Sequence, residues 1–113
     1  KFDRFEDIIA WQKAKELSVS VYKEFNKSKD FGFRDQIQRA SVSIMNNIAE
    51  GFERKSNKEF RYFLFVAKGS CGELRSMLQL ARELGKISEE IFEEKYNWSE
   101  EMSKILSSLI KRL

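Results

Sequence analysis

The stretch from Gln36 to Arg54, QIQRASVSIMNNIAEGFER, has the composition of a helix but carries apolar residues on more than one side. Steps of three and four residues join one stripe, made of Ile37, Ser41, Ile44 and Ile48. The same spacing joins a second stripe on nearly the opposite side, made of Val42, Met45, Ala49 and Phe52. A helix that is apolar on two sides is usually covered on both. The pattern therefore predicts a helix that packs on its own fold with one side and on a second subunit with the other.

Polar residues lie between these two stripes, and they include Arg39, Asn46, Asn47 and Glu50. Such groups can hydrogen-bond across a subunit seam, where an unpaired buried group would cost about 1–3 kcal/mol. The alternative is that Met45 and Phe52 are scattered surface residues or extend a broad core. The two readings differ in whether this side of the helix meets another chain.

Gly69 and Gly72 lie inside another helical segment, where each costs about 1 kcal/mol relative to Ala. Small residues at these positions would let a neighbouring helix approach closely, although glycines tolerated on a solvated face are an equal alternative. The residues expected at an oligomer interface are Arg39, Val42, Met45, Asn46, Asn47, Ala49, Glu50, Phe52, Gly69 and Gly72.

Four helices account for the whole chain. The first is expected from Phe5 to Asn26 with Asp3 as its cap, and the second from Phe33 to Glu53. The third follows the Ser56 cap and ends near Gly85, and the fourth follows the Ser88 cap with an apolar stripe of Ile91, Trp98, Met102, Ile105, Leu109 and Leu113. Short connections favour antiparallel neighbours. The expectation is an all-α, up-down-up-down four-helix bundle, one domain over residues 1–113, that assembles into a symmetric homo-oligomer.

The composition agrees with a globular, helical protein. Of the 113 residues, 42% are hydrophobic and 35% are charged, and the chain has no Pro and only five Gly. No apolar run approaches the roughly 18 residues of a membrane span. The single Cys71 cannot form an internal disulfide, which fits a reducing cytoplasm. We therefore expect a cytoplasmic location and no membrane partner.

The residue types in the chain offer little basis for catalysis. His is absent, so Cys71 has no imidazole to activate it. The glutamate pairs 89/90, 93/94 and 100/101 resemble those of carboxylate-rich di-iron bundles, but those sites need Glu-x-x-His motifs. A solvated acidic helix face is the simpler reading. The chain is not expected to be an enzyme or to hold a metal or cofactor.

A basic row follows a seven-residue period through the third helix and its approach: Arg54, Arg61, Lys68, Arg75 and Arg82. Seven residues are nearly two turns, so these cations should line one side at intervals of roughly 10.5 Å. Lys58 and Lys86 flank them, and residues 54–86 carry eight basic against three acidic side chains. A row of cations is the electrostatic footprint of a phosphate-backbone partner, read with little sequence specificity. Solvation of the helix, or ion pairs with a neighbour, is the alternative.

The sequence resembles the four-helix-bundle family of 23S rRNA intervening-sequence proteins in three stretches. These are FxDxxxWQKA near the start, QIQRASVSIMNNIAEG in the second helix and SNKEFRYFLFVAKGSCGEL entering the third. The resemblance covers essentially the whole chain and implies a homopentameric, barrel-like assembly. A related bundle is the accessory variability determinant of diversity-generating retroelements, which partners a reverse transcriptase and binds nucleic acid.

Two functions of different class follow from these patterns. The first is a non-catalytic RNA- or DNA-binding oligomer, with self-association, nucleic acid and a reverse transcriptase as its expected partners. The second is a structural or protein-interaction bundle, in which the basic row forms salt bridges between subunits. If nucleic acid is the ligand, the expected phosphate contacts are Arg54, Lys58, Arg61, Lys68, Arg75, Arg82 and Lys86.

Overall fold

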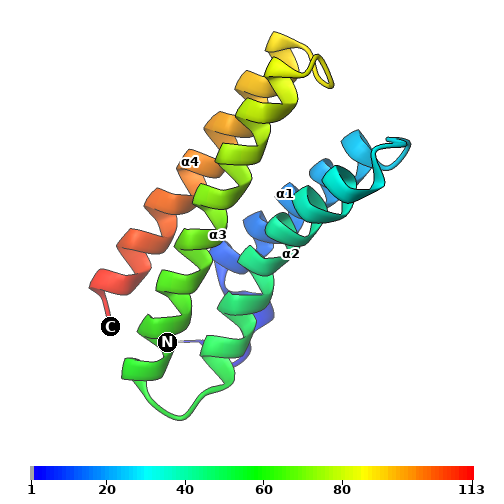
Figure 1. Ribbon diagram of the computed structural model, residues 1–113. Coiled ribbons are helices and arrows are strands. Elements are labelled where there is room, and N and C mark those ends of the chain that lie inside the picture. Colours follow the sequence, from blue (N-terminus) through cyan, green and yellow to red (C-terminus); the bar gives the residue numbers. More distant parts are fainter. Residues whose placement is uncertain (1) are drawn as a thin grey trace.

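The computed structural model of the protein describes residues 2–113, and all regular secondary structure in that range is helical. A short 3₁₀ helix, η1 (Phe5–Asp7), precedes the four long helices α1 (Ile9–Phe25), α2 (Phe31–Glu53), α3 (Asn57–Glu83) and α4 (Glu89–Lys111). Successive helices run antiparallel and pack side by side, and α1 also packs against α4 (Figure 1). The prediction of an all-α fold with four long helices is confirmed.

Side-chain caps explain where three of the helices begin. The hydroxyls of Ser56 and Ser88 accept hydrogen bonds from the amides of Glu59 and Ile91, as the sequence predicted. The carboxylate of Asp30 accepts a similar bond from the Phe33 amide and starts α2 two residues earlier than expected. These caps place the three connections between helices.

The predicted end of α3 is confirmed, whereas the predicted start of α1 is wrong. Gly85 follows α3 with φ of +71°, a left-handed conformation that glycine adopts without strain, so the predicted end is confirmed. The predicted cap at Asp3 is wrong, because residues near it form η1, whose N-cap Arg4 has no side-chain cap bond. The chain then extends at Ile8, which is buried, and α1 begins only after it. Burial of Ile8 thus takes precedence over a longer helix.

The core runs along the length of an elongated molecule of 43 × 22 × 19 Å. Each helix contributes fully buried aliphatic side chains, such as Leu17, Ile44, Leu74 and Leu106. Both chain ends lie at the end of the bundle that holds the α2–α3 connection, and the other two connections lie at the opposite end (Figure 1). The start of α3 and the end of α4 therefore lie at the same end of the bundle as the two chain ends (Figure 1).

The buried face of α4 differs from the stripe predicted for it. Met102 and Leu109 are buried as expected, but Ile91, Trp98 and Ile105 are only partly buried. Five further residues of α4 are buried that the predicted stripe did not include: Phe92, Lys95, Ser99, Leu106 and Ile110. A helix in this arrangement contacts two neighbours, so its buried face is wider than one stripe, and that of α4 is turned toward α3.

The second stripe of α2 also lies elsewhere than predicted. Met45 and Phe52 pack against the core, and the Phe52 ring centroid is 6.0 Å from that of Phe60 in α3. Half of this stripe therefore extends the core, which is the alternative reading for these two residues. Val42 and Ala49 are half-buried, while Arg39 and Asn46 are exposed. The expectation of an apolar side opposite the core is thus wrong for Met45 and Phe52.

Candidate nucleic-acid interface

Four members of the basic row lie on α3 along its seam with α4. Arg61, Lys68, Arg75 and Arg82 are half-buried, and their charged ends reach toward α4 or its N-terminal turn. Their seven-residue period places them at intervals of roughly 10.5 Å along the helix. The four cations therefore form one linear array along α3. Their contact with phosphate stays a prediction.

Three of these cations are held by neutral acceptors. Arg61 Nη1 donates to the carbonyl of Ile110 at 2.9 Å, and Lys68 Nζ donates to Ser107 Oγ at 2.6 Å. Arg75 Nη1 makes a longer bond of 3.5 Å to a carbonyl of α4. Within residues 2–113, no carboxylate oxygen lies within 4.0 Å of their charged nitrogens. We call Arg61, Lys68 and Arg75 the central triplet: α4 fixes its geometry and leaves its charge uncompensated.

The ends of the row are neutralised within the chain. Arg82 pairs with Glu89 at 3.4 Å, and its guanidinium carbon lies 3.9 Å from the centroid of the Phe92 ring. Arg54 pairs with Glu50 at 2.6 Å and with Glu59 at 3.8 Å. These contacts give both arginines a structural role that the sequence analysis did not assign.

Lys86 is compensated as well. Its Nζ lies 3.1 Å from a carboxylate oxygen of Asp30, and this bond joins the α1–α2 and α3–α4 connections. The hydrogen bond from Lys86 and then that from the Phe33 amide lower the pKa of Asp30 below its ordinary value. Lys58, by contrast, is exposed and forms no ion pair within residues 2–113. Of the seven predicted phosphate contacts, Lys58 and the central triplet form no ion pair with any of residues 2–113.

The polar residues of α2 divide between its seam with α3 and solvent. Ser43 Oγ and Ser70 Oγ are 2.8 Å apart and join the two helices, and the Asn47 amide donates to the carbonyl of Ser43 at 2.8 Å. Asn47 is partly buried, whereas Arg39 and Glu50 are exposed in the single chain, and their predicted hydrogen bonds across a subunit seam stay a prediction. Asn47 therefore supports the α2–α3 seam from within α2.

The two glycines of α3 face open space. Nothing lies within 4 Å of a Cβ built on Gly69, and only the Arg75 guanidinium, at 3.8 Å, comes near one built on Gly72. No helix of the described chain uses the close approach that these glycines permit. Their predicted role in contact with another chain stays a prediction.

Large apolar side chains are exposed on α3 before and after Gly69, and none of them was predicted. Tyr62 is 63% exposed and Phe65 is 53% exposed. We define the outer α3 face as Tyr62, Phe65, Val66, Gly69, Ser76, Leu80 and Leu84, all of which are exposed. Steps of three and four residues join Tyr62, Phe65, Val66 and Gly69, and again Ser76, Leu80 and Leu84, with the exposed Glu73 between the two groups. The stronger core stripe on the same helix hid this pattern.

The remaining candidate groups are Cys71 and the glutamate pairs of α4, of which Glu89 pairs with Arg82 of the basic row. Cys71 is fully buried, and burial raises the pKa of its thiol to about 11. The six glutamates of the three pairs in α4 are all exposed, in line with a solvated acidic face.

No helix in residues 2–113 combines the length and the apolar character needed to cross a membrane.

Comparisons with known proteins bear on this geometry. Residues 6–108 match the family model for 23S rRNA-intervening sequence proteins. A solved structure described as a protein of unknown function from the S23 ribosomal protein family, from Bacteroides thetaiotaomicron, superimposes with a TM-score of 0.85. It is 32% identical in sequence, and the alignment covers 91% of this chain and 99% of that one. None of the curated proteins matches the chain. The fold, together with a match that spans most of the sequence, shows that the chain belongs to the family of 23S rRNA-intervening sequence proteins.

Proposed function

We propose that this protein is a non-catalytic, oligomeric helical module that binds RNA or DNA through the phosphate backbone with little sequence specificity. The observation that carries the proposal is the central triplet: three cations in a row whose hydrogen bonds within residues 2–113 are all to neutral groups. Phosphate oxygens are the acceptors that such groups bind most strongly. An array of this kind is suited to a polyanion.

The geometry of the triplet favours backbone contact over base recognition. Adjacent cations are roughly 10.5 Å apart, and phosphates of one duplex strand are about 3.4 Å apart along the axis, so each interval spans about three nucleotides. The hydrogen bonds of Arg61 and Lys68 to α4 hold them against the helix seam, so they are not free to reach into a groove. Contacts to phosphate position a protein without reading its target sequence.

Assembly would multiply this short array. Clustered exposed apolar side chains mark interaction surfaces, and the outer α3 face supplies two such groups, one before and one after the exposed Glu73. We propose that a second copy covers this face together with the exposed part of α2, and the resemblance favours a pentamer. Repetition of the triplet around a symmetric oligomer would join weak contacts through multivalency. The assembly could then serve as an adaptor for a nucleic-acid enzyme such as a reverse transcriptase.

A salt series tests nucleic-acid binding. Affinity for structured RNA, duplex DNA and single strands should fall steeply with salt, because each neutralised phosphate releases condensed counterions. A triple variant, Arg61→Gln/Lys68→Gln/Arg75→Gln, should bind more weakly and reduce the logarithmic salt slope by up to about 3 per chain engaged. The matched control, Lys13→Gln/Lys23→Gln/Lys27→Gln in α1 and the turn after it, removes the same charge from another part of the chain.

The outcomes separate the two functions. Equal loss of binding in both triple variants would show that net charge acts alone and would remove the triplet from the account. No binding by the wild-type oligomer near 50 mM salt, where phosphate contacts are strong, would favour the structural bundle instead.

Light scattering tests assembly separately. The wild type should exceed the 13.4 kDa of one chain, and Phe65→Glu should shift the population toward single chains because it places a charge in the proposed seam. Tyr22→Glu, at another exposed aromatic position on α1, should leave the mass unchanged. A monomeric wild type would exclude the proposed assembly.

A further inference from the structure

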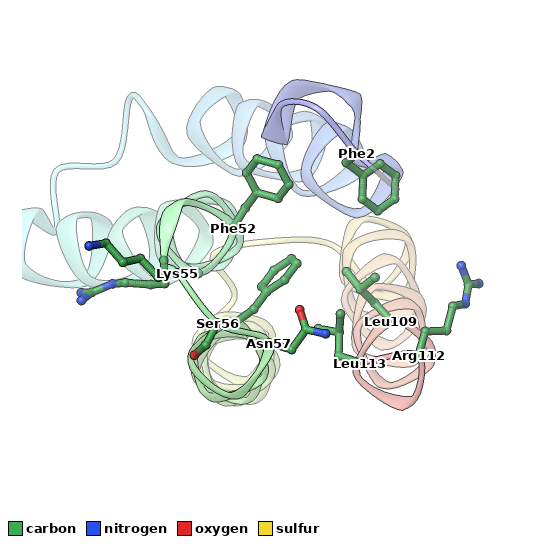
Figure 2. A pocket seen from close by; sticks show the side chains of 11 residues that line it. Phe2, Phe52, Lys55, Ser56, Asn57, Leu109, Arg112 and Leu113 are labelled. Atoms are coloured by element: carbon green, nitrogen blue, oxygen red, sulfur yellow. The ribbon is translucent and has the colours of Figure 1, made fainter.

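A cavity of about 380 Å³ opens at the end of the bundle where the α2–α3 connection meets the C-terminal end of α4 (Figure 2). This volume lies at the lower end of the range for small-ligand sites. Its lining consists of Phe2, Gly51, Phe52, Arg54, Lys55, Ser56, Asn57, Phe60, Leu109, Arg112 and Leu113. None of the central triplet is among these residues, so the cavity is separate from the array on α3.

The inner wall is aromatic and aliphatic. Phe52 and Phe60 meet edge to face with ring centroids 6.0 Å apart, and Phe2 and Leu109 line the same cavity. Phe52 is only partly buried, so its ring remains accessible from the cavity. Such a wall can pack on both an apolar chain and a planar ring.

One polar group faces this wall. The side-chain amide of Asn57, at the first turn of α3, points toward Leu109 and Leu113 across the cavity (Figure 2). It forms no hydrogen bond with any of residues 2–113. An amide offers both a donor and an acceptor, which a hydrocarbon chain cannot use and the edge of a nucleobase can.

Two cationic residues lie on opposite sides of the cavity, and their charged ends are directed away from it (Figure 2). Lys55 and Arg112 are exposed on different elements at its rim, and neither forms an ion pair within residues 2–113. Arg54, at the same rim, is paired with Glu50. Two cations without an ion pair thus extend outward from opposite sides of a cavity that has an aromatic wall and one hydrogen-bonding amide.

We propose that this cavity binds one unstacked nucleobase of a single strand, with the adjoining phosphates at Lys55 and Arg112. The inference rests on the proposed nucleic-acid function and adds a second site to it. Unpaired bases are recognised by stacking on aromatic rings and by hydrogen bonds to their edges, which are the two features that Phe52 and Asn57 supply. Duplexes have no free base to offer, so the site favours single-stranded segments, loops and ends.

The test compares two strands of equal length, one with bases and one abasic. Fluorescence anisotropy should show that the wild type binds the strand with bases more tightly, by about 5- to 150-fold if one base stacks. Phe52→Leu keeps an apolar side chain and removes the ring, and Asn57→Ala removes the amide at an exposed position. Each should reduce the preference for the strand with bases and leave abasic binding unchanged. Asn97→Ala, an exposed amide on α4 outside the cavity, is the matched control.

Failure of this site is distinguishable from failure of the proposed function. Equal binding of the two strands overturns the base site and leaves backbone binding intact. A preference that survives in both Phe52→Leu and Asn57→Ala also overturns it, because the base is then bound elsewhere. Binding of neither strand overturns both. If Phe52→Leu fails to fold, the exposed Asn57→Ala variant alone decides the outcome.

Discussion

A Cβ atom placed on Gly51 would lie 2.7 Å from the Cβ of Phe63, closer than carbon atoms of neighbouring helices approach. The Phe60 carbonyl would be only 3.3 Å away. Gly51 is in the last turn of α2, just before the connection to α3, and it is buried there. The absence of a side chain therefore lets α2 and α3 meet near their connection, on the wall of the cavity at the end of the bundle.

Gly51→Ala should destabilise the fold. The methyl group would force the two helices apart, and overpacking of this kind typically costs about 1–3 kcal/mol. The measurement is the free energy of unfolding by urea denaturation.

Gly69→Ala is the matched control for this substitution. Position 69 is also inside a helix, but nothing lies within 4 Å of the added methyl group, so the higher helix propensity of Ala should stabilise the chain by up to about 1 kcal/mol. Equal and favourable effects of both substitutions would show that α2 and α3 do not meet closely at Gly51.

Lys95 provides a second test, because its side chain is only 4% exposed and reaches from α4 to α1. Its Nζ donates to Ser20 Oγ and lies 3.5 Å from a carboxylate oxygen of the exposed Glu94. Lys95→Met keeps the aliphatic stem and removes the buried charge, so stability should be unchanged or higher. Lys95→Ala should instead lose about 2–3 kcal/mol by leaving a cavity. Thermal unfolding distinguishes the two variants. If Lys95→Met lost more stability than Lys95→Ala, the charge itself would be shown to stabilise the α1–α4 contact.

Cys71 predicts a pH dependence on the alkaline side. Burial raises the pKa of its thiol from 9.0 to about 11, so the folded state holds this proton more tightly than the unfolded state. The contribution to stability is complete below pH 9 and is lost as pH rises toward 11, by about 2–3 kcal/mol. Denaturation of wild type and Cys71→Ala across this range isolates the effect of the thiol. Parallel curves for the two proteins would contradict the raised pKa.

Asp30 and Lys86 predict a dependence on the acidic side. The pKa of Asp30 is lowered first by its hydrogen bond with Lys86, so stability from this carboxylate is present above its ordinary pKa of 3.8 and is lost as pH falls through the lowered pKa. In Lys86→Met the pKa should return toward 3.8, while the bond from the Phe33 amide keeps part of the shift. Titration by NMR measures this directly, with Lys104→Met, at an exposed lysine of α4, as the control. An unchanged Asp30 titration in Lys86→Met would exclude the proposed link between the two connections.

The sequence by itself determined the four helices and most of their limits. The caps at Ser56 and Ser88 and the left-handed Gly85 depend on short-range backbone chemistry, which a few neighbouring residues specify. The seven-residue spacing likewise determined that Arg61, Lys68 and Arg75 share one side of α3. Only the tertiary structure decided what faces that side: the neutral acceptors of α4 leave these charges uncompensated, while Arg54, Arg82 and Lys86 meet carboxylates.

The same limit explains the wrong and missing assignments. Met45 and Phe52 share a stripe with Val42, but whether that stripe meets solvent or the core depends on where neighbouring helices lie around α2. Gly51 looked like any glycine near a helix end, and its function comes from Phe63, twelve residues further along the chain. The cavity is formed by residues from near both ends of the chain and from the α2–α3 connection. Contacts of this kind depend on the packing of whole helices, and helical periodicity describes one helix at a time.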